Sequence, residues 1–280
     1  MTFIYNNIHS LKFTKKPILN IYNKNNFFKS ISVGIPINVF SNIYTNIHYG
    51  YDITDFKTFF IQFLLSYYTY GKDRYSDALE YNNLLKYNVS LINYDNNKKI
   101  LYNEIIQNQN FYLLSFIFSF SVILYILLND FNNIYNLPFI QLLYTTNYYK
   151  DIKKYISIFK PFYISIMWTM ASVILPCVLH DDNYNILFYP QDYLPFLLTI
   201  FATSNFADNK DIIEDKFNNI NTIPVVFGKY ISNYINILCL SLGSIILINS
   251  IHFENRFLVN SLVEIQNLGL ITLIYNDTFN

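Results

Sequence analysis

Long stretches without a charged residue alternate with short charged segments along this chain. A membrane-spanning helix needs about 20 largely apolar residues, and several uncharged stretches reach or approach that length. Two shorter stretches, 58–71 and 193–207, become long enough when they are extended upstream through Lys57 and Asp192, respectively. The last stretch, 257–276, carries Glu264. The pattern therefore predicts eight membrane-spanning helices, at residues 30–51, 58–71, 105–129, 131–149, 161–180, 193–207, 230–253 and 257–276.

The basic residues fall almost entirely on one side of this arrangement. With eight spans, the N-terminus and the second, fourth and sixth loops share one side, and 17 of the 19 Lys and Arg residues lie there. Lys57 and Arg256 are the two on the other side. Because the cytoplasmic loops of membrane proteins are rich in Lys and Arg, we expect the basic side to be cytoplasmic, or to face the matrix or stroma of an organelle.

Composition agrees with a membrane protein. Hydrophobic residues make up 52% of the chain and charged residues only 14%, against about 25% charged residues in ordinary soluble proteins. The 19 basic residues balance the 19 acidic ones, and this zero net charge argues against a nucleic-acid partner. We expect a multi-pass integral membrane protein in contact with the lipid bilayer, with a basic N-terminal tail at residues 1–26 and a membrane domain at residues 27–280.

Two groups of aspartates follow unusually short apolar stretches on the basic side. They are Asp73 and Asp77 after the second span, and Asp208, Asp211 and Asp215 after the sixth. On continuous helices each group occupies one face, and Thr69 lies one turn before Asp73. Like charges stacked in this way destabilise a helix, so the spacing favours a bound cation.

Carboxylate oxygens suit a hard divalent cation. Mg²⁺ in particular usually joins one or two carboxylates to the phosphates of a substrate. Two facing groups of aspartates would hold such ions around a diphosphate. Arg74, Lys153 and Lys210 are predicted on the same side of the membrane and could take the remaining phosphate charge.

Two other interpretations of these acids stay open. Each carboxylate could simply be solvated at a helix end, as in any multi-pass membrane protein. The chain could also be a cation-coupled transporter or a non-catalytic multi-pass scaffold. A transporter is expected to carry its acids within the spans, whereas the centres of the secure spans here contain none.

The segment around the second group resembles the second signature of the UbiA family of membrane prenyltransferases. That signature is D-x2-D-x3-D, followed by a T-hydrophobic-P-V segment and a Gly. The chain matches it at Asp208, Asp211, Asp215, Thr222, Pro224 and Gly228.

Two further segments are similar to motifs of the same family. The first signature, N-x3-D-x3-D, corresponds to Thr69-x3-Asp73-x3-Asp77, with Thr in place of Asn. The Y-x3-K motif between the fourth and fifth helices corresponds to Tyr149 and Lys153. The similarity extends over roughly residues 27–250.

The resemblance implies an all-α bundle of the family's nine-helix type, with a central cavity that opens toward the acidic loops. Family members bind an isoprenyl diphosphate through Mg²⁺ held by the two aspartate motifs. Loss of diphosphate leaves an allylic cation, which an acceptor, often an aromatic ring, captures. The chain is therefore expected to be an enzyme that transfers a prenyl group from an isoprenyl diphosphate to a hydrophobic or aromatic acceptor.

The resemblance also assigns roles to residues of this chain. The catalytic and metal-binding residues are expected to be Asp73, Asp77, Asp208, Asp211 and Asp215. The substrate-binding residues are expected to be Thr69, Arg74, Tyr149, Lys153, Asn205 and Lys210. Aromatic residues that could line the cavity, or simply pack between helices, are Tyr67, Tyr70, Tyr144, Trp168 and Phe206.

The chain departs from the family pattern in three places. Thr69 replaces an Asn whose amide oxygen is the better metal ligand. Residues 81–110 are rich in Asn and longer than a loop between two spans requires. After residue 230 there is room for two spans, where the family normally has three.

Overall fold

The computed structural model describes residues 43, 45, 46, 56–86, 96–129, 157–177, 189–217, 219–249 and 257–279. Every element that these residues form is helical, which confirms the predicted all-α class. The long helices are α3 (Phe56–Lys86), α4 (Asn96–Gln107), α5 (Gln109–Asn129), α8 (Lys160–Thr169), α10 (Pro190–Asp208), α12 (Ile223–Asn249) and α13 (Phe257–Phe279). The short ones are the 3-10 helix η3 (Ser157–Phe159), the π-helix η4 (Met170–Ile174) and α11 (Ile212–Phe217).

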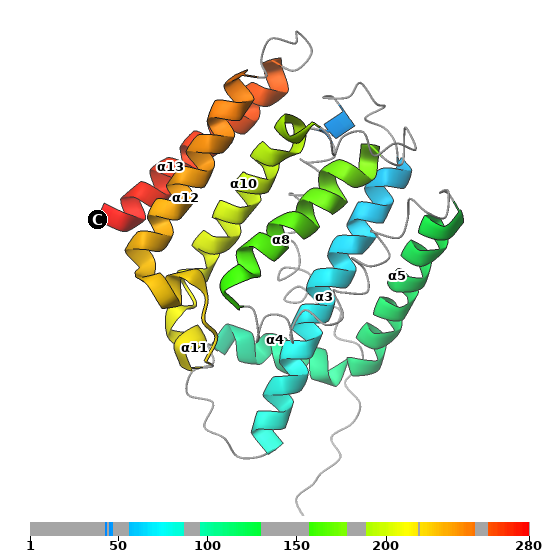
Figure 1. The fold of residues 1–280 in the computed structure, drawn as a ribbon. Coiled ribbons are helices and arrows are strands. Elements are labelled where there is room, and N and C mark those ends of the chain that lie inside the picture. Colours follow the sequence, from blue (N-terminus) through cyan, green and yellow to red (C-terminus); the bar gives the residue numbers. More distant parts are fainter. Residues whose placement is uncertain are drawn as a thin grey trace, which may run out of the picture.

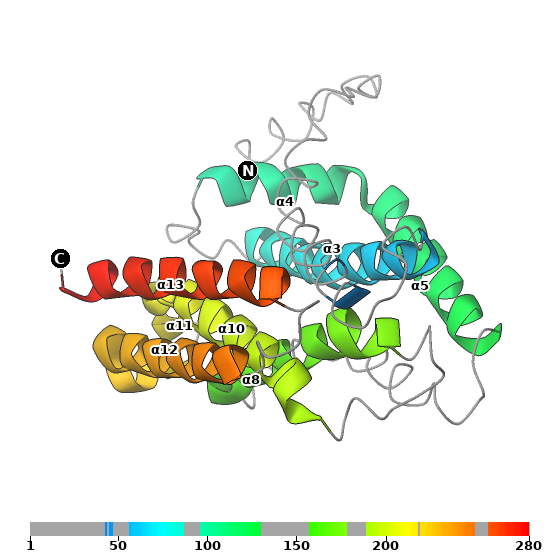
Figure 2. The ribbon, with the colours of Figure 1, turned by 90° about the horizontal axis from the view of Figure 1, so that it is seen from above.

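The helices pack as a bundle of two neighbouring groups. In one group α10 lies between α8 and α12, and α13 packs against α12 (Figures 1 and 2). In the other group α3 packs against α5, and α4 crosses α3 at one end of the bundle (Figure 1). The C-terminal half of α3, the N-terminal end of α8, the C-terminal end of α10 and all of α11 lie toward this same end. We refer to it below as the motif end, because α3, α10 and α11 carry the aspartates.

Helix boundaries agree in part with the predicted spans. Helices overlap six of the predicted stretches, and three of the helices are long and apolar enough to cross a membrane, at Gln109–Leu128, Ser157–Cys177 and Ile223–Asn249. The predicted spans at 30–51 and 131–149 lie outside the described residues, apart from 43, 45 and 46. The structure thus supports membrane-spanning helices without establishing eight spans or the UbiA arrangement.

One predicted span was wrong. The stretch 105–129 is not one helix, because α4 ends at Gln107 and α5 begins at Gln109. The helix that holds the first aspartate group extends beyond the predicted span at 58–71, since α3 continues to Lys86. Part of the Asn-rich region after residue 80 is therefore helical, and α4 packs on α3 through the rings of Tyr81 and Tyr102, whose centroids are 5.5 Å apart.

The surface of the bundle is apolar and part of its interior is polar. On α12 the buried positions include Ser232, Asn233 and Asn236, whereas Leu238 and Leu242 are more than half exposed. In water the hydrophobic effect favours the opposite arrangement. A helix whose polar face is inside and whose large apolar side chains face outward is suited to lipid contact.

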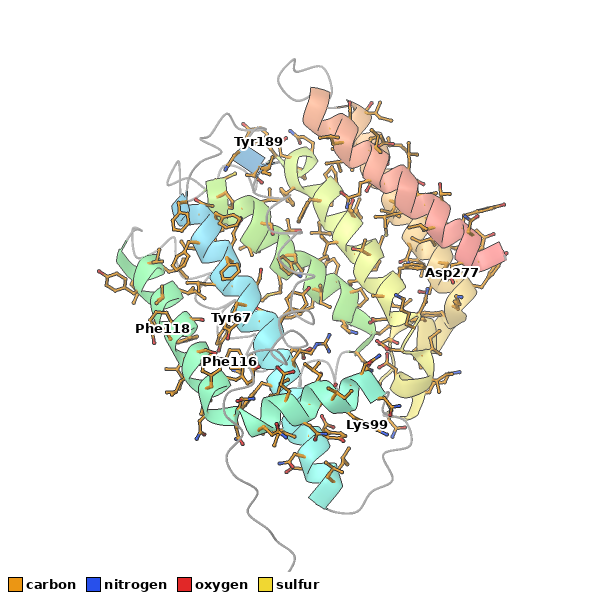
Figure 3. The ribbon with its side chains drawn as sticks, turned by 180° about the vertical axis from the view of Figure 1, so that it is seen from behind. Tyr67, Lys99, Phe116, Phe118, Tyr189 and Asp277 are labelled. Carbon is orange, nitrogen blue, oxygen red and sulfur yellow. The ribbon has the colours of Figure 1, made fainter. Side chains whose placement is uncertain are left out.

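Helix α5, on the other side of the bundle, also exposes large apolar side chains, although most of its buried residues are apolar as well (Figure 1). Phe116 is 4% exposed and packs against Tyr67 of α3, with ring centroids 5.7 Å apart. Phe118, two residues later, is 65% exposed and points outward (Figure 3). The apolar outer faces of α5 and α12 are compatible with a bilayer around the protein.

Side-chain hydrogen bonds between polar residues join α10, α12 and α13. Asn205 of α10 donates to Ser232 and Asn236 of α12, at 3.0 and 2.7 Å. Thr199 of α10 donates to Asn267 of α13 at 2.9 Å. Such bonds hold helices together where the surroundings provide no hydrophobic driving force.

The π-helix η4 is stabilised by side chains from outside its own helix. The N–H of Leu175 bonds the carbonyl of Met170, five residues back. In this register the next donor would be residue 176, which is a proline and has no N–H. The Gln62 amide of α3 donates instead to the Ala171 carbonyl at 3.1 Å. This bond helps to fix α3 against the α8–η4 segment.

Candidate functional site

The first aspartate motif lies on a single helix, as predicted. Thr69, Asp73 and Asp77 occupy successive turns of α3, and Asp73 and Asp77 are both partly buried. The Arg74 guanidinium is 3.6 Å from the Asp77 carboxylate. Burial lowers the pKa of Arg74, but the carboxylates of Asp73 and Asp77 raise it by more, so that this pKa lies above its ordinary value. Arg74 is therefore a fixed positive charge within the motif.

The second motif does not lie on one helix, contrary to the prediction from spacing. Asp208 is in the last turn of α10, Asp211 is in the following turn, and Asp215 is in α11. The N–H of Asp211 bonds the Asp208 carbonyl at 3.1 Å, three residues back, which breaks the helical register. The three carboxylates thus come from two helices and a turn instead of from one helical face.

Asp208 forms an ion pair with Lys160, the first residue of α8. The two side chains are 5% and 13% exposed, so the pair is largely buried between the ends of α10 and α8. Lys160 was not among the predicted site residues. The two residues are 48 positions apart in the sequence, so local spacing gives no sign of the pair.

Asp215 is positioned by the segment that follows it. The Thr222 hydroxyl donates to the Asp215 carboxylate at 3.2 Å, and both residues are buried. The Ile220 N–H bonds the Asp215 carbonyl at 2.8 Å. Next to this turn, the N–H of Asn221 donates to the Ser157 hydroxyl at 2.9 Å, which ties it to η3 at the start of α8. The threonine of the T-hydrophobic-P-V segment therefore orients the last aspartate of the motif.

The remaining predicted substrate-binding residues are spread over different surroundings. Asn205 is fully buried in the α10–α12 contact described above, whereas Lys210 is exposed. Tyr149 and Lys153 lie outside the described residues, so their roles stay predictions.

The predicted cavity aromatics lie in different surroundings. The Trp168 indole N–H donates to the Tyr70 hydroxyl at 3.2 Å, so these two rings join α8 to α3 one turn before Asp73. Tyr67 hydrogen-bonds Ser115 of α5 at 2.7 Å. Phe206 packs in the apolar cluster between α10, α12 and α13, and Tyr144 lies outside the described residues. Of these aromatics, Tyr70 and Trp168 are the pair that lies beside the first motif.

The donors at the motif end suit a metal ion that is shared with a substrate. Among the described residues, no three or more His, Cys, Asp or Glu side chains lie close enough together to hold a metal by themselves. Mg²⁺ usually needs only one or two protein carboxylates, and takes its other ligands from water and substrate phosphates. Asp208 and Asp215 each supply a buried carboxylate at the motif end, and a cation, the Lys160 ammonium, already lies beside Asp208.

Comparison of the chain with protein-family models, with curated proteins and with solved structures finds no match. The likeness to the UbiA family therefore rests on the three sequence motifs.

Proposed function

We propose that this protein is a membrane prenyltransferase that transfers a prenyl group from an isoprenyl diphosphate to a hydrophobic or aromatic acceptor, with Mg²⁺ as cofactor. The observation that carries the proposal is the second motif. Its aspartates, the threonine that orients Asp215 and the glycine at the bend of α12 match one signature, and they lie together at one end of the bundle.

Charge at the motif end supports binding of a diphosphate. Asp73 and Asp77 lie beside the permanent charge of Arg74, and Asp208 lies beside Lys160. Arg and Lys side chains form strong, charge-assisted hydrogen bonds to phosphate oxygens. Bound Mg²⁺ would neutralise the charge that develops on the departing diphosphate.

The side chains next to the first motif suit the prenyl group. Tyr70 and Trp168 present aromatic surface one turn from Asp73. Such a wall accommodates an isoprenoid chain, and aromatic faces stabilise a nearby positive charge. It also excludes water, which protects a reactive cation from hydrolysis.

The membrane fits the same assignment. Isoprenyl diphosphates have long apolar tails, and the outer faces of α5 and α12 expose the apolar side chains that a bilayer would cover. We place the motif end on the basic side of the membrane, which is the cytoplasmic side or the matrix or stromal side of an organelle.

Diphosphate release tests the proposal. Membrane vesicles that contain the protein, and with them the hydrophobic acceptors of the membrane, are incubated with labelled farnesyl or geranylgeranyl diphosphate, with and without Mg²⁺. We expect Mg²⁺-dependent release that is lost in Asp73→Asn and in Asp211→Asn. The matched control is Asp277→Asn, because Asp277 is an aspartate of α13 that pairs with Lys229 and belongs to neither motif. Release that is unchanged in both motif variants would contradict the proposal.

The same preparation separates an enzyme from a cation-coupled transporter or a scaffold. A transporter moves a cation into sealed vesicles without consuming the diphosphate, and a scaffold does neither. Only an enzyme is therefore expected to release diphosphate and to lose that release in Asp73→Asn and Asp211→Asn.

A further inference from the structure

The buried ion pair between Lys160 and Asp208 is at odds with the local preferences of both helices. Lys160 is the first residue of α8, and Asp208 is in the last turn of α10. The partial charge at a helix N-terminus is positive and that at a C-terminus is negative. Each side chain thus has the same sign as the helix end that carries it. Helix stability does not account for either residue.

Burial makes the position of the pair more unusual. Taking a lysine and an aspartate out of water is costly, and their attraction often only balances that cost. The chain has a second lysine–aspartate pair, Lys229 with Asp277 at 2.8 Å, but its side chains are 46% and 35% exposed. The Lys160 pair differs from it because it is buried and because its aspartate is the first residue of the second motif.

We propose that Lys160 is the resident counter-cation of Asp208, and that it competes with a divalent metal ion for this carboxylate. This inference rests on the proposed function, in which Asp208 is a metal ligand. Without metal, the ammonium group contributes a positive charge beside the buried carboxylate of Asp208. When a metal ion binds Asp208, the ammonium is displaced from the carboxylate and its charge becomes available to a diphosphate oxygen.

The competition sets the metal affinity of the site. Lys160 bonds Oδ1 of Asp208. A metal ion that binds both oxygens of this carboxylate replaces that hydrogen bond, and hydrogen bonds between charged groups are strong. Removing the ammonium should therefore tighten metal binding. If Lys160 had a purely structural role, its removal would only destabilise the protein and would leave the metal affinity unchanged or weaker.

The affinity of the full chain for Mn²⁺ in detergent tests this inference. Binding is measured by electron paramagnetic resonance, in which the signal of free Mn²⁺ decreases as the ion binds. We expect Lys160→Gln to lower the Kd for Mn²⁺ about tenfold. Lys160→Arg keeps the positive charge and should leave the Kd unchanged. Lys229→Gln is the matched control, since it breaks a lysine–aspartate pair outside the motifs, and it should also leave the Kd unchanged.

The possible outcomes distinguish this inference from the proposed function. If the unaltered protein binds Mn²⁺ and Asp211→Asn does not, but Lys160→Gln has the same Kd as the unaltered protein, the role of Lys160 is wrong and the proposed function stands. If neither the unaltered protein nor Lys160→Gln binds Mn²⁺, both are wrong.

A second measurement needs no variant and so does not depend on whether Lys160→Gln folds. The amines of the unaltered protein are methylated with formaldehyde and a mild reductant, and the extent at each lysine is read by mass spectrometry. We expect methylation of Lys160 to rise when Mg²⁺ is added, while that of the exposed Lys229 stays constant. Equal methylation of Lys160 with and without Mg²⁺ would overturn the inference.

Discussion

Gly228 has a backbone conformation that only glycine adopts without strain. Its φ is 83° and its ψ is 156°, which interrupts α12 between two helical segments. A methyl group at this position would meet no atom within 4 Å. Any cost of Gly228→Ala therefore comes from the backbone and not from a steric clash. We expect a loss of about 1–3 kcal/mol in the free energy of unfolding, measured by thermal denaturation in detergent.

Gly269→Ala is the control for this prediction. Gly269 lies inside α13, and a methyl group there would also meet no atom within 4 Å. Because alanine is favoured over glycine within a helix, this variant should gain about 0.5–1 kcal/mol. A Gly228→Ala protein as stable as Gly269→Ala would show that the bend at Gly228 is not required.

Spacing along the sequence identified residues of each motif but not the side chains that pair with them. The separation of Asp73 and Asp77 by four residues was enough to place both on one face of α3. No comparable rule pairs Asp208 with Lys160, because that contact depends on how α8 packs against α10. The hydrogen bond from Thr222 to Asp215 likewise depends on the turn that brings the start of α12 back to α11.

At the scale of helices, the uncharged stretches predicted the positions of most helices because burial and lipid contact both exclude charge. The break after Asp208 was missed, since the residues that follow it include no Pro or Gly. Asn209 is the C-terminal cap of α10 and donates from its side chain to Asn233 of α12 at 2.6 Å. This contact comes from another helix, so a pattern within α10 does not reveal it.

The π-helix η4 gives a testable prediction about the hydrogen bond from the Gln62 amide of α3 to the Ala171 carbonyl. Gln62→Leu removes the donor to the Ala171 carbonyl and leaves it buried without that partner, which should cost about 1–3 kcal/mol. In Pro176→Ala, residue 176 gains the N–H that proline lacks, and in the π-helical register this N–H would donate to the Ala171 carbonyl five residues back. In the double variant we therefore expect the cost of Gln62→Leu to be smaller than in the single variant, as measured by thermal denaturation. Additive costs would show that Gln62 does not substitute for the missing N–H.

The contact between the end of α13 and α12 predicts a dependence on pH. The hydrogen bond from Lys229 lowers the pKa of Asp277, and although partial burial raises it, a further hydrogen bond from Asn233 also lowers it. The folded state thus binds a proton at Asp277 less readily than the unfolded state. The stabilisation is complete above the ordinary aspartate pKa of about 3.9 and is lost as the pH falls through the lower, folded value.

We expect the melting temperature to fall as the pH is lowered below about 4, and to fall less in Asp277→Asn, which has no carboxylate to protonate. Because the pair is partly exposed, the difference should be small and should shrink in high salt. Identical pH profiles for the two proteins would rule out a contribution from this pair.

For the whole molecule, the distribution of polar residues is stronger support for a membrane location than the number of apolar helices. Three helices are long and apolar enough to span a membrane. In addition, Asn205, Asn233 and Asn236 are buried, while large apolar residues of α5 and α12 face outward. The absence of charge along a span does not separate these faces, because asparagine is uncharged and occurs within the uncharged stretches.

Fluorescence quenching by brominated lipids tests which face of α5 meets the bilayer. The chain has a single tryptophan, Trp168, so replacing it by Phe gives a background in which one new tryptophan reports alone. Phe118 is 65% exposed and Phe116 is 4% exposed, although both lie on the same helix (Figure 3). We expect strong quenching of Phe118→Trp and weak quenching of Phe116→Trp in vesicles, because bromine quenches only at short range. Unbrominated lipid is the control. Weak quenching at both positions would mean that lipid does not cover the outer face of α5, and equally strong quenching at both would contradict its packing against α3.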